Sequence, residues 1–353
     1  MNRYIGVDAH LETCTLGVMG ESGRRLKEQV IETNGQALRS FLLSFAGDKH
    51  ICLEEGELSE WLYELLLPVA KDVVVVQPEK RKGNKSDSRD AWDLAEALRT
   101  RRRATVVYKA PGAYRGVREA VDTHRALTRE MVRIKNRLRA VFRARGIGGF
   151  GQELYDPEAR KSWIEKLCAA RRRRAQLYAE ELDNQLALVE RAEAWLREEA
   201  RACVAVKVLA SAPGIGLVRA SQVVATVLTP QRFRTKRQFW AYCGLAVVSR
   251  SSSDWEPKSE AGFRPKHRSL TRGLNRNHNP LLKEVFKGAA LTVIQRMADI
   301  PLAHNYRRLV EEERVNPAMA RLTLARQIAA VTLAMWKKQE VYDPTRYPSS
   351  KTV

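Results

Sequence analysis

Short apolar runs alternate with amphipathic stretches in the N-terminal part of the chain. Residues 34–45 and 58–69 place apolar side chains at helical spacing, and a third helix is predicted to begin near Ser86 or Asp87. The run VVVV is apolar on both faces, which is typical of a parallel strand inside a sheet. Strands that alternate with helices indicate an α/β domain. The predicted strands occupy residues 4–7, 13–19, 26–31, 51–54 and 73–76.

The pattern becomes helical from residue 114 onward. Residues 114–145 predict one long helix, and residues 157–204 predict a second helical stretch. We interpret the second stretch as a helical hairpin or coiled coil for contact between protomers, with packing inside the chain as the alternative. Two apolar helical stretches flank the turn PGIG at 213–216, and later helices are predicted at about 281–297 and 318–338. We therefore predict an α/β domain at 1–156, a helical region at 157–204 and a mainly α domain at 205–353.

The net charge of the chain indicates which class of molecule it binds. The 353 residues include 62 Lys and Arg against 41 Asp and Glu, so the formal net charge is +21 and the pI is near 10.0. Such an excess of cations favours polyanions, DNA or RNA, as partners. No apolar run approaches the roughly 20 residues that span a bilayer, and the N-terminus has no signal-peptide pattern, so a cytoplasmic protein is expected. The five cysteines are scattered among apolar residues, which predicts reduced thiols in the core.

Four acidic residues stand at positions where the pattern predicts burial. Asp8 lies on the first strand, and Glu54 ends the fourth strand. Asp87 and Asp90 share the apolar stripe of the helix that starts there, so both are predicted to face the sheet. Burying a lone carboxylate costs on the order of several kcal/mol, so a cation is expected near a buried acid. Four converging carboxylates suit two Mg²⁺ ions roughly 4 Å apart, which clamp the attacking and leaving oxygens of a phosphodiester.

Each acid also has an ordinary structural explanation. Asp87 and Asp90 could complement the dipole at a helix N-terminus. Glu54 could form a strand-end pair with Glu55, and Asp8 could belong to a turn. His10 lies near these acids in the sequence, and we interpret it as a hydrogen-bonded structural histidine.

The set of acids resembles the DEDD motif of the insertion-sequence transposases related to the Piv DNA invertases, a family of bridge-RNA-guided recombinases. Asp8, Glu54 and the stretch KSDSRDA, which carries Asp87 and Asp90, match the order and spacing of that motif. The resemblance covers nearly the whole chain, although Glu55 stands where small residues are usual. It implies an RNase H-like, resolvase-like fold for residues 1–156, Mg²⁺ (or Mn²⁺) at the acids, and DNA and a guide RNA as partners. A homo-oligomer, dimer or tetramer, is expected because a recombinase holds two duplexes.

Nucleic-acid contacts are predicted at three places in the sequence. Basic residues precede the third predicted helix, and others lie on the C-terminal half of the long helix. PGIG resembles a helix-hairpin-helix whose glycines let backbone N–H groups approach a phosphate. A solvated basic face is the alternative reading of the charged positions. The predicted contact residues are Lys80, Arg81, Lys82, Lys85, Arg133, Lys135, Arg137, Arg139, Arg143, Gly214 and Gly216.

A serine is predicted to act as a nucleophile. Residues 233–254 resemble the C-terminal transposase domain of the same family, in which a glycine-leucine pair precedes the functional serine. Counting from Gly244 and Leu245 selects Ser252, with Ser251 and Ser253 as neighbouring alternatives. Ser253 also replaces the glycine that usually follows this serine. A serine-rich loop without a function is the structural alternative.

The residues and the resemblance together predict a DNA transposase or recombinase that cuts and rejoins strands. One alternative is a metal-dependent Holliday-junction-type nuclease, in which the acids activate water and Ser252 does no chemistry. Another is a non-enzymatic RNA-binding scaffold. Covalent protein–DNA adducts separate the first reading from the second, and metal-dependent strand cleavage excludes the third.

Overall fold

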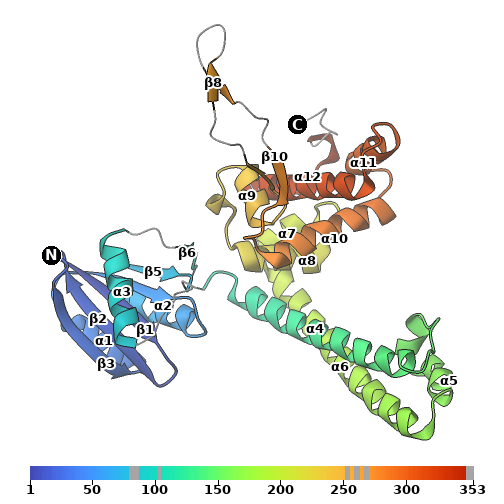
Figure 1. Cartoon of the computed structure of the whole chain (residues 1–353), viewed down its shortest axis with the longest axis horizontal. Helices are drawn as coiled ribbons and strands as arrows, with labels where there is room; N and C mark the ends of the chain where they lie inside the picture. The colour runs from blue at the N-terminus through green and yellow to red at the C-terminus, as the bar shows by residue number, and fades with distance from the viewer. Residues whose placement is uncertain are drawn as a thin grey trace. The chain divides into compact units, whose positions relative to one another are not determined.

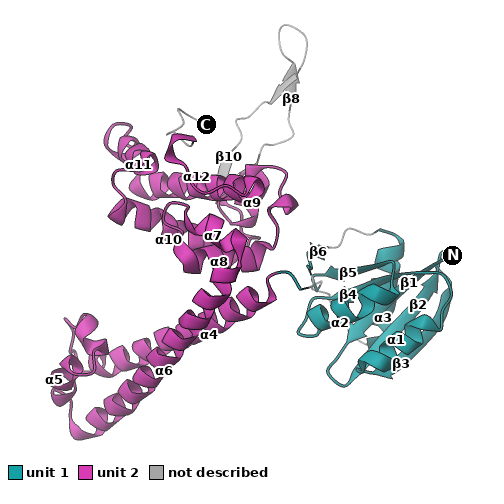
Figure 2. Cartoon of the chain, turned by 180° about the vertical axis from the view of Figure 1, so that it is seen from behind, with its two compact units in different colours: residues 1–113 teal, residues 114–353 magenta. Residues whose placement is uncertain are grey.

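A computed structural model describes residues 1–78, 87–101, 105–110, 112–250, 255–257, 263–265 and 270–346 of the chain. The chain divides into two compact units, Met1–Ala113 and Tyr114–Val353 (Figure 2). The first unit contains a mixed sheet with helices, and the second is mostly helical. The division into three domains, at 1–156, 157–204 and 205–353, stays a prediction.

The sheet of the first unit has six strands in the order β3-β2-β1-β4-β5-β6 (Figure 1). β1 lies near the centre, antiparallel to β2 and parallel to β4, while β5 is parallel to β4 and antiparallel to β6. All five predicted strands are present, and this order is consistent with an RNase H-like α/β domain. The strands are β1 (Asn2–Ala9), β2 (Thr13–Gly20), β3 (Arg25–Glu32), β4 (Asp48–Glu54), β5 (Asp72–Val76) and β6 (Val106–Val107).

Helices cover both faces of this sheet. On one face, Ile5 and Val7 of β1 pack with Leu38 of α1 (Gly35–Leu43) and Leu62 of α2 (Ser59–Leu66), which continues into η1 (Leu67–Val69). Asn34 caps α1, its side chain accepting hydrogen bonds from the backbone N–H groups of residues 36 and 37. The opposite face carries α3 (Asp87–Arg99), which contacts β1, β2 and β4. Because side chains alternate along a strand, the positions of β1 next to Ile5 and Val7, which include Gly6 and Asp8, face α3.

A glycine sets how closely α3 approaches the sheet. A Cβ atom on Gly6 would lie 1.8 Å from the carbonyl oxygen of Ala91, in the middle of α3. Gly17 on β2 meets the ring of Trp92 in the same way, at 3.0 Å. Only residues without a side chain at these points let the helix backbone lie directly on the strands, and this brings the start of α3 to the end of β1.

Gly6→Ala should therefore destabilise the first unit by about 3 kcal/mol or more, because helix backbone cannot move aside as a flexible side chain can. The measurement is chemical unfolding of the full chain. Gly56→Ala is the matched control, since a Cβ atom at Gly56 meets nothing within 4 Å. Equal stability of the two variants would contradict this account of the contact.

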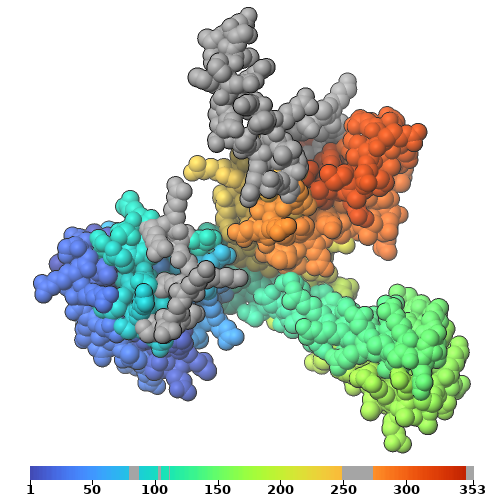
Figure 3. Space-filling view, in the orientation of Figure 1, coloured from blue at the N-terminus to red at the C-terminus, as the bar shows by residue number. Residues whose placement is uncertain are grey.

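The second unit begins with a helical hairpin. α4 (Arg115–Arg143) packs against α6 (Ala169–Ala202), and Leu138 and Phe142 of α4 share a core with Leu182 of α6. Figure 3 shows the hairpin as a solid arm of side chains in green and yellow-green. The two helices thus pack against each other within one chain. This agrees with the alternative expectation of packing inside the chain. The predicted helical stretch at 157–204 consists of α5 (Ala159–Glu165) and α6, and η2 (Gln152–Tyr155) lies just before it.

The remaining helices surround a large apolar core. Phe239, Phe286 and Trp336 are among its fully buried members, and both predicted late helices are present. α11 was not predicted, although it begins with a proline and its apolar residues recur at helical spacing. The elements are α7 (Val204–Ala210), α8 (Gly216–Val227), η3 (Pro230–Arg232), α9 (Lys236–Tyr242), β7 (Val247–Arg250), β8 (Trp255–Pro257), β9 (Phe263–Pro265), β10 (Leu270–Leu274), α10 (Pro280–Arg296), α11 (Pro301–Glu311), α12 (Pro317–Lys338) and η4 (Pro344–Arg346).

Two further expectations concern the membrane and the cysteines. Within the described ranges, no helix combines the length and the apolar character needed to cross a bilayer. All five cysteines are free thiols, and four are buried as expected. Cys168 is exposed, which corrects the prediction for that residue: it stands at the N-cap of α6, outside the packed seam of the hairpin.

Candidate functional site

Asp8 is a largely buried carboxylate at the end of β1. The alternation that puts Ile5 and Val7 in the core turns Asp8 toward α3, and its side chain is 17% exposed. Burial raises the pKa of the Asp8 carboxyl above its ordinary value, and the negative charges of Asp87 and Asp90 raise it further. His10 acts in the opposite direction. The charged form of Asp8 is therefore unfavourable without a nearby cation.

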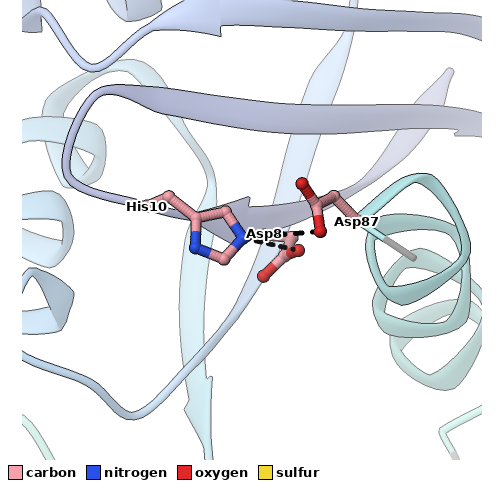
Figure 4. Close-up of side chains that lie close together, drawn as sticks. All are labelled: Asp8, His10 and Asp87. Atoms are coloured by element: carbon pink, nitrogen blue, oxygen red, sulfur yellow. Dashed lines mark ion pairs between the residues drawn. The ribbon is translucent and has the colours of Figure 1, made fainter. Parts of the chain in front are cut away.

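Asp87 and His10 complete a close group with Asp8. The Nε2 atom of His10 lies 3.4 Å from Oδ2 of Asp8 and 3.6 Å from Oδ1 of Asp87. One ligand atom from each of the three residues falls within 4.8 Å of the others. Figure 4 shows the three side chains converging, with His10 just beyond β1 and Asp87 at the first turn of α3.

Among the described residues, the close group of ligand atoms does not include the other two predicted acids, Glu54 and Asp90. Val7 of β1 is in register with Leu53 of parallel β4, so Asp8 and Glu54 follow at matching positions and leave their strands on the same side. Burial, reinforced by the charge of Glu54, raises the pKa of Cys52 to about 12. Asp90 is one helical turn from Asp87, and its charge acts on Asp8.

Glu55 is directed elsewhere. Its Oε1 accepts a hydrogen bond from Nζ of Lys109 at 2.9 Å, and the same ammonium donates to Oγ of Ser59 at 3.2 Å. The Lys109 side chain is only 13% exposed. Glu55 therefore compensates a nearly buried ammonium group, which explains why an acid can stand where the resemblance leads one to expect a small residue.

The donor set suits a divalent cation. Carboxylate oxygens are the ligands that Mg²⁺ prefers, and an imidazole beside them is equally compatible with Mn²⁺. The side chain of His10 hydrogen-bonds to Asp8, as expected from the sequence. It is also 55% exposed and lies 3.6 Å from Asp87, so it is in addition a candidate ligand. The missed signal was its position two residues after Asp8, which places both side chains on one side of an extended chain.

Divalent metal should stabilise the wild-type chain but not Asp8→Asn. A raised pKa means that the folded state binds the proton more tightly than the unfolded state, so Asp8 lowers the stability of the metal-free protein as pH rises through that pKa. Asparagine removes this cost. A cation at a hundredfold excess over its Kd adds about 2.7 kcal/mol. Thermal unfolding with and without Mn²⁺ measures the difference, and an equal rise in Tm for both proteins would contradict a metal at Asp8.

Two of the predicted nucleic-acid residues on α4 form ion pairs within the hairpin. Arg133 and Arg137 both pair with Glu130, at 3.0 and 2.6 Å. Arg137 also reaches Glu181 of α6 at 3.3 Å, which links the two helices. The Arg133 side chain remains 72% exposed despite its partner.

Two more basic side chains of α4 lie over aromatic rings. Lys135 and Arg139 are 4.5 and 5.4 Å from the ring centroid of Tyr155. Such contacts stabilise by about 0.5–1 kcal/mol where exposed and help to close the hairpin tip. Together with Arg143 at the end of α4, these residues stay predicted contacts, and their packing roles are an alternative reason for their presence.

The two predicted glycines precede and open α8. Gly214 and Gly216 have φ values of +71° and +59°, a conformation that favours glycine. A Cβ atom on Gly214 would also lie 2.3 Å from the carbonyl oxygen of Ala289 in α10. A Cβ atom on Gly216 would meet no atom of the described residues within 4 Å, so only its backbone conformation favours glycine there.

Several predicted residues lie outside the part of the chain that the structure describes. They are the basic residues before α3 and the candidate nucleophile with its two neighbours: Lys80, Arg81, Lys82, Lys85, Ser251, Ser252 and Ser253.

Two family models match the chain. A transposase model of the DEDD IS110 type matches residues 5–144 and includes all four acids. A model of the transposase IS116/IS110/IS902 family matches residues 206–307, which include Ser252. A comparison with curated proteins found no match. With both domains present in this order, the chain belongs to the IS110 family of DEDD transposases.

Proposed function

We propose that this transposase cuts and rejoins DNA strands of an insertion sequence at a divalent-metal site formed by Asp8, Glu54, Asp87 and Asp90. The observation that carries the proposal is the convergence of Asp8, Asp87 and His10 within the segment that matches the DEDD transposase model. We further propose Mg²⁺, or Mn²⁺, as the metal.

The proposed metal ligands are positioned by different elements of the first unit. Asp8 is held by a central strand, so its carboxylate has a fixed position and little water around it. Asp87 and Asp90 come from the first turn of a helix held against the sheet at Gly6. Clustered carboxylates disfavour one another's charge until a cation binds. A bound divalent ion would supply Lewis-acid stabilisation of the phosphodiester that is cut.

The proposed nucleophile is Ser252, on the basis of the family resemblance and the match to residues 206–307. Its Oγ would lose a proton and bond to phosphorus, while the bond to the leaving deoxyribose oxygen breaks and that oxygen is protonated. Attack by the hydroxyl of a second strand would reverse these steps and rejoin the DNA. A serine hydroxyl needs activation by a base or metal. We propose that Ser252 meets the acids within a homo-oligomer or within one chain.

Target choice is proposed to depend on a guide RNA. The net charge of +21 suits a protein that holds polynucleotide backbones, and base pairing can then read the sequence. The test compares protein stripped of RNA with the same protein supplied with RNA transcribed from the flanks of its element. Site-specific recombination should disappear and then return, whereas specific recombination by RNA-free protein would refute guidance by RNA.

A further inference from the structure

A cavity of about 550 Å³ lies between three helices of the second unit. α4 contributes His124, Arg125 and Arg129, the start of α8 contributes residues 216–219, and α10 contributes Glu284 and Gly288. The core beneath it, which includes Val121 of α4, is well packed. The cavity is thus a hollow on a stable scaffold, and its lining comes from parts of the sequence that are far apart.

Positive charge dominates the lining. Arg125, Arg129 and Arg219 face one carboxylate among the lining residues, that of Glu284. Burial lowers the pKa of Arg125, and the neighbouring charge of Arg129 lowers it further. The side chain of Asp122 pairs with Arg125 only at 4.0 Å and is 77% exposed. An anion between the two guanidinium groups would relieve their repulsion.

Arg219 is held in place on the floor of the cavity. Its Nη1 donates to the carbonyl oxygen of Gly214 at 2.6 Å and to Oγ1 of Thr292 at 3.0 Å. Gly288 leaves room for the guanidinium, since a Cβ atom there would lie 3.0 Å from Nη2. Arg219 thus ties Gly214, in the turn before α8, to Thr292 of α10, and this turn leads directly into Gly216, which lines the cavity.

A buried polar atom also lacks a partner beside the cavity. Nδ1 of His124 is buried and has no hydrogen-bond partner among the described residues. Burial lowers the pKa of this imidazole, so it is a neutral ring with one donor and one acceptor nitrogen. Gly216, Leu217 and Val218 at the first turn of α8 line the same space, and the N-cap residue Ile215 supplies no side-chain hydrogen bond to that turn.

The positive surface continues across α10. A second hollow of about 470 Å³ shares Glu284 and Gly288 with the first. Its lining adds Lys283, Lys287 and Arg321. A chain of phosphates, rather than a single small anion, would find cations on both sides of the helix.

We infer that the cavity between α4, α8 and α10 binds backbone phosphate of a polynucleotide, with Arg125 and Arg129 as the contacting cations and Arg219 as a positioning residue. The inference rests on the proposed function only for the class of ligand. Gly216 was predicted from the sequence to contact nucleic acid. The proposed site adds Arg125, Arg129 and Arg219, which the sequence pattern did not identify.

The experiment measures binding of the full chain to labelled oligo-dT and oligo-U of equal length, without divalent metal and over a range of salt. Arg125→Gln with Arg129→Gln should weaken binding by about tenfold or more, because each lost contact removes a charge-assisted hydrogen bond. The slope of log K against log salt should fall by roughly 0.7 for each lost phosphate contact. Glu284→Gln should change affinity in the opposite direction.

The matched control is Arg191→Gln with Arg201→Gln, which removes the same charge from exposed positions on α6. Loss with both probes supports a shared phosphate site, while loss with only one assigns the site to RNA or to DNA. An effect no larger than that of the control would overturn the inference. Arg129 is exposed, so Arg129→Gln alone keeps the test decisive if the double variant is unstable. Cleavage needs metal, and this binding assay contains none. The proposal of a metal site at the four acids can therefore be wrong without changing the result of the binding test.

Discussion

Asp8→Asn should reduce metal-dependent strand cleavage by on the order of a thousandfold or more, which corresponds to about 4 kcal/mol of transition-state stabilisation. Asparagine keeps the shape of the side chain, so β1 and the core behind it should remain folded. What it removes is the charge that is most deeply held in the site, beside Asp87 and His10. Single-turnover cleavage of DNA carrying the ends of the element, with RNA supplied, measures the effect.

The other acids and one neighbour provide the comparison. Glu54→Gln, Asp87→Asn and Asp90→Asn should each abolish recombination while nucleic-acid binding persists, and full activity in any two of the four variants would refute the four-acid site. Glu55→Gln should be mild, because Glu55 bonds to Lys109 and not to the group around Asp8. Its loss should lower stability by about 1 kcal/mol without changing cleavage by the folded protein.

Ser252→Ala should eliminate covalent protein–DNA adducts and recombination together. The expectation follows from the proposed chemistry, in which the serine oxygen holds the phosphoryl group between cutting and rejoining. Metal binding should survive, so the rise in Tm with Mn²⁺ should match that of the wild type. Adducts trapped during the reaction and mapped by mass spectrometry show which residue carries the DNA.

Ser251→Ala and Ser253→Ala test the register of this assignment. Both should retain some adduct formation and recombination if Ser252 is the nucleophile. DNA found on another residue would move the nucleophile, and adduct-free cleavage under every condition would favour hydrolysis of the junction-resolvase type.

The local pattern of this sequence predicted five strands and the three helices of the first unit, but not β6, which has only two residues. The apolar run at residues 4–7 predicted β1 and the acid Asp8 on it, whereas the face on which Asp8 lies became clear only from the burial of Ile5 and Val7 in the folded strand. Asp87 and Asp90 were placed on α3 by the same kind of reasoning with the helical period. The helix α11 was missed, although its apolar residues recur at helical spacing after Pro301.

The tertiary structure decided which surfaces meet. His10 joins Asp8 and Asp87, and Glu55 turns to Lys109, although both lie within two residues of predicted site residues. Arg125 and Arg219 line one cavity from helices that lie far apart along the chain. Side-chain direction follows from local backbone geometry, which a sequence pattern encodes, whereas contact between distant segments follows from how whole faces pack, here through the close approaches at Gly6 and Gly214.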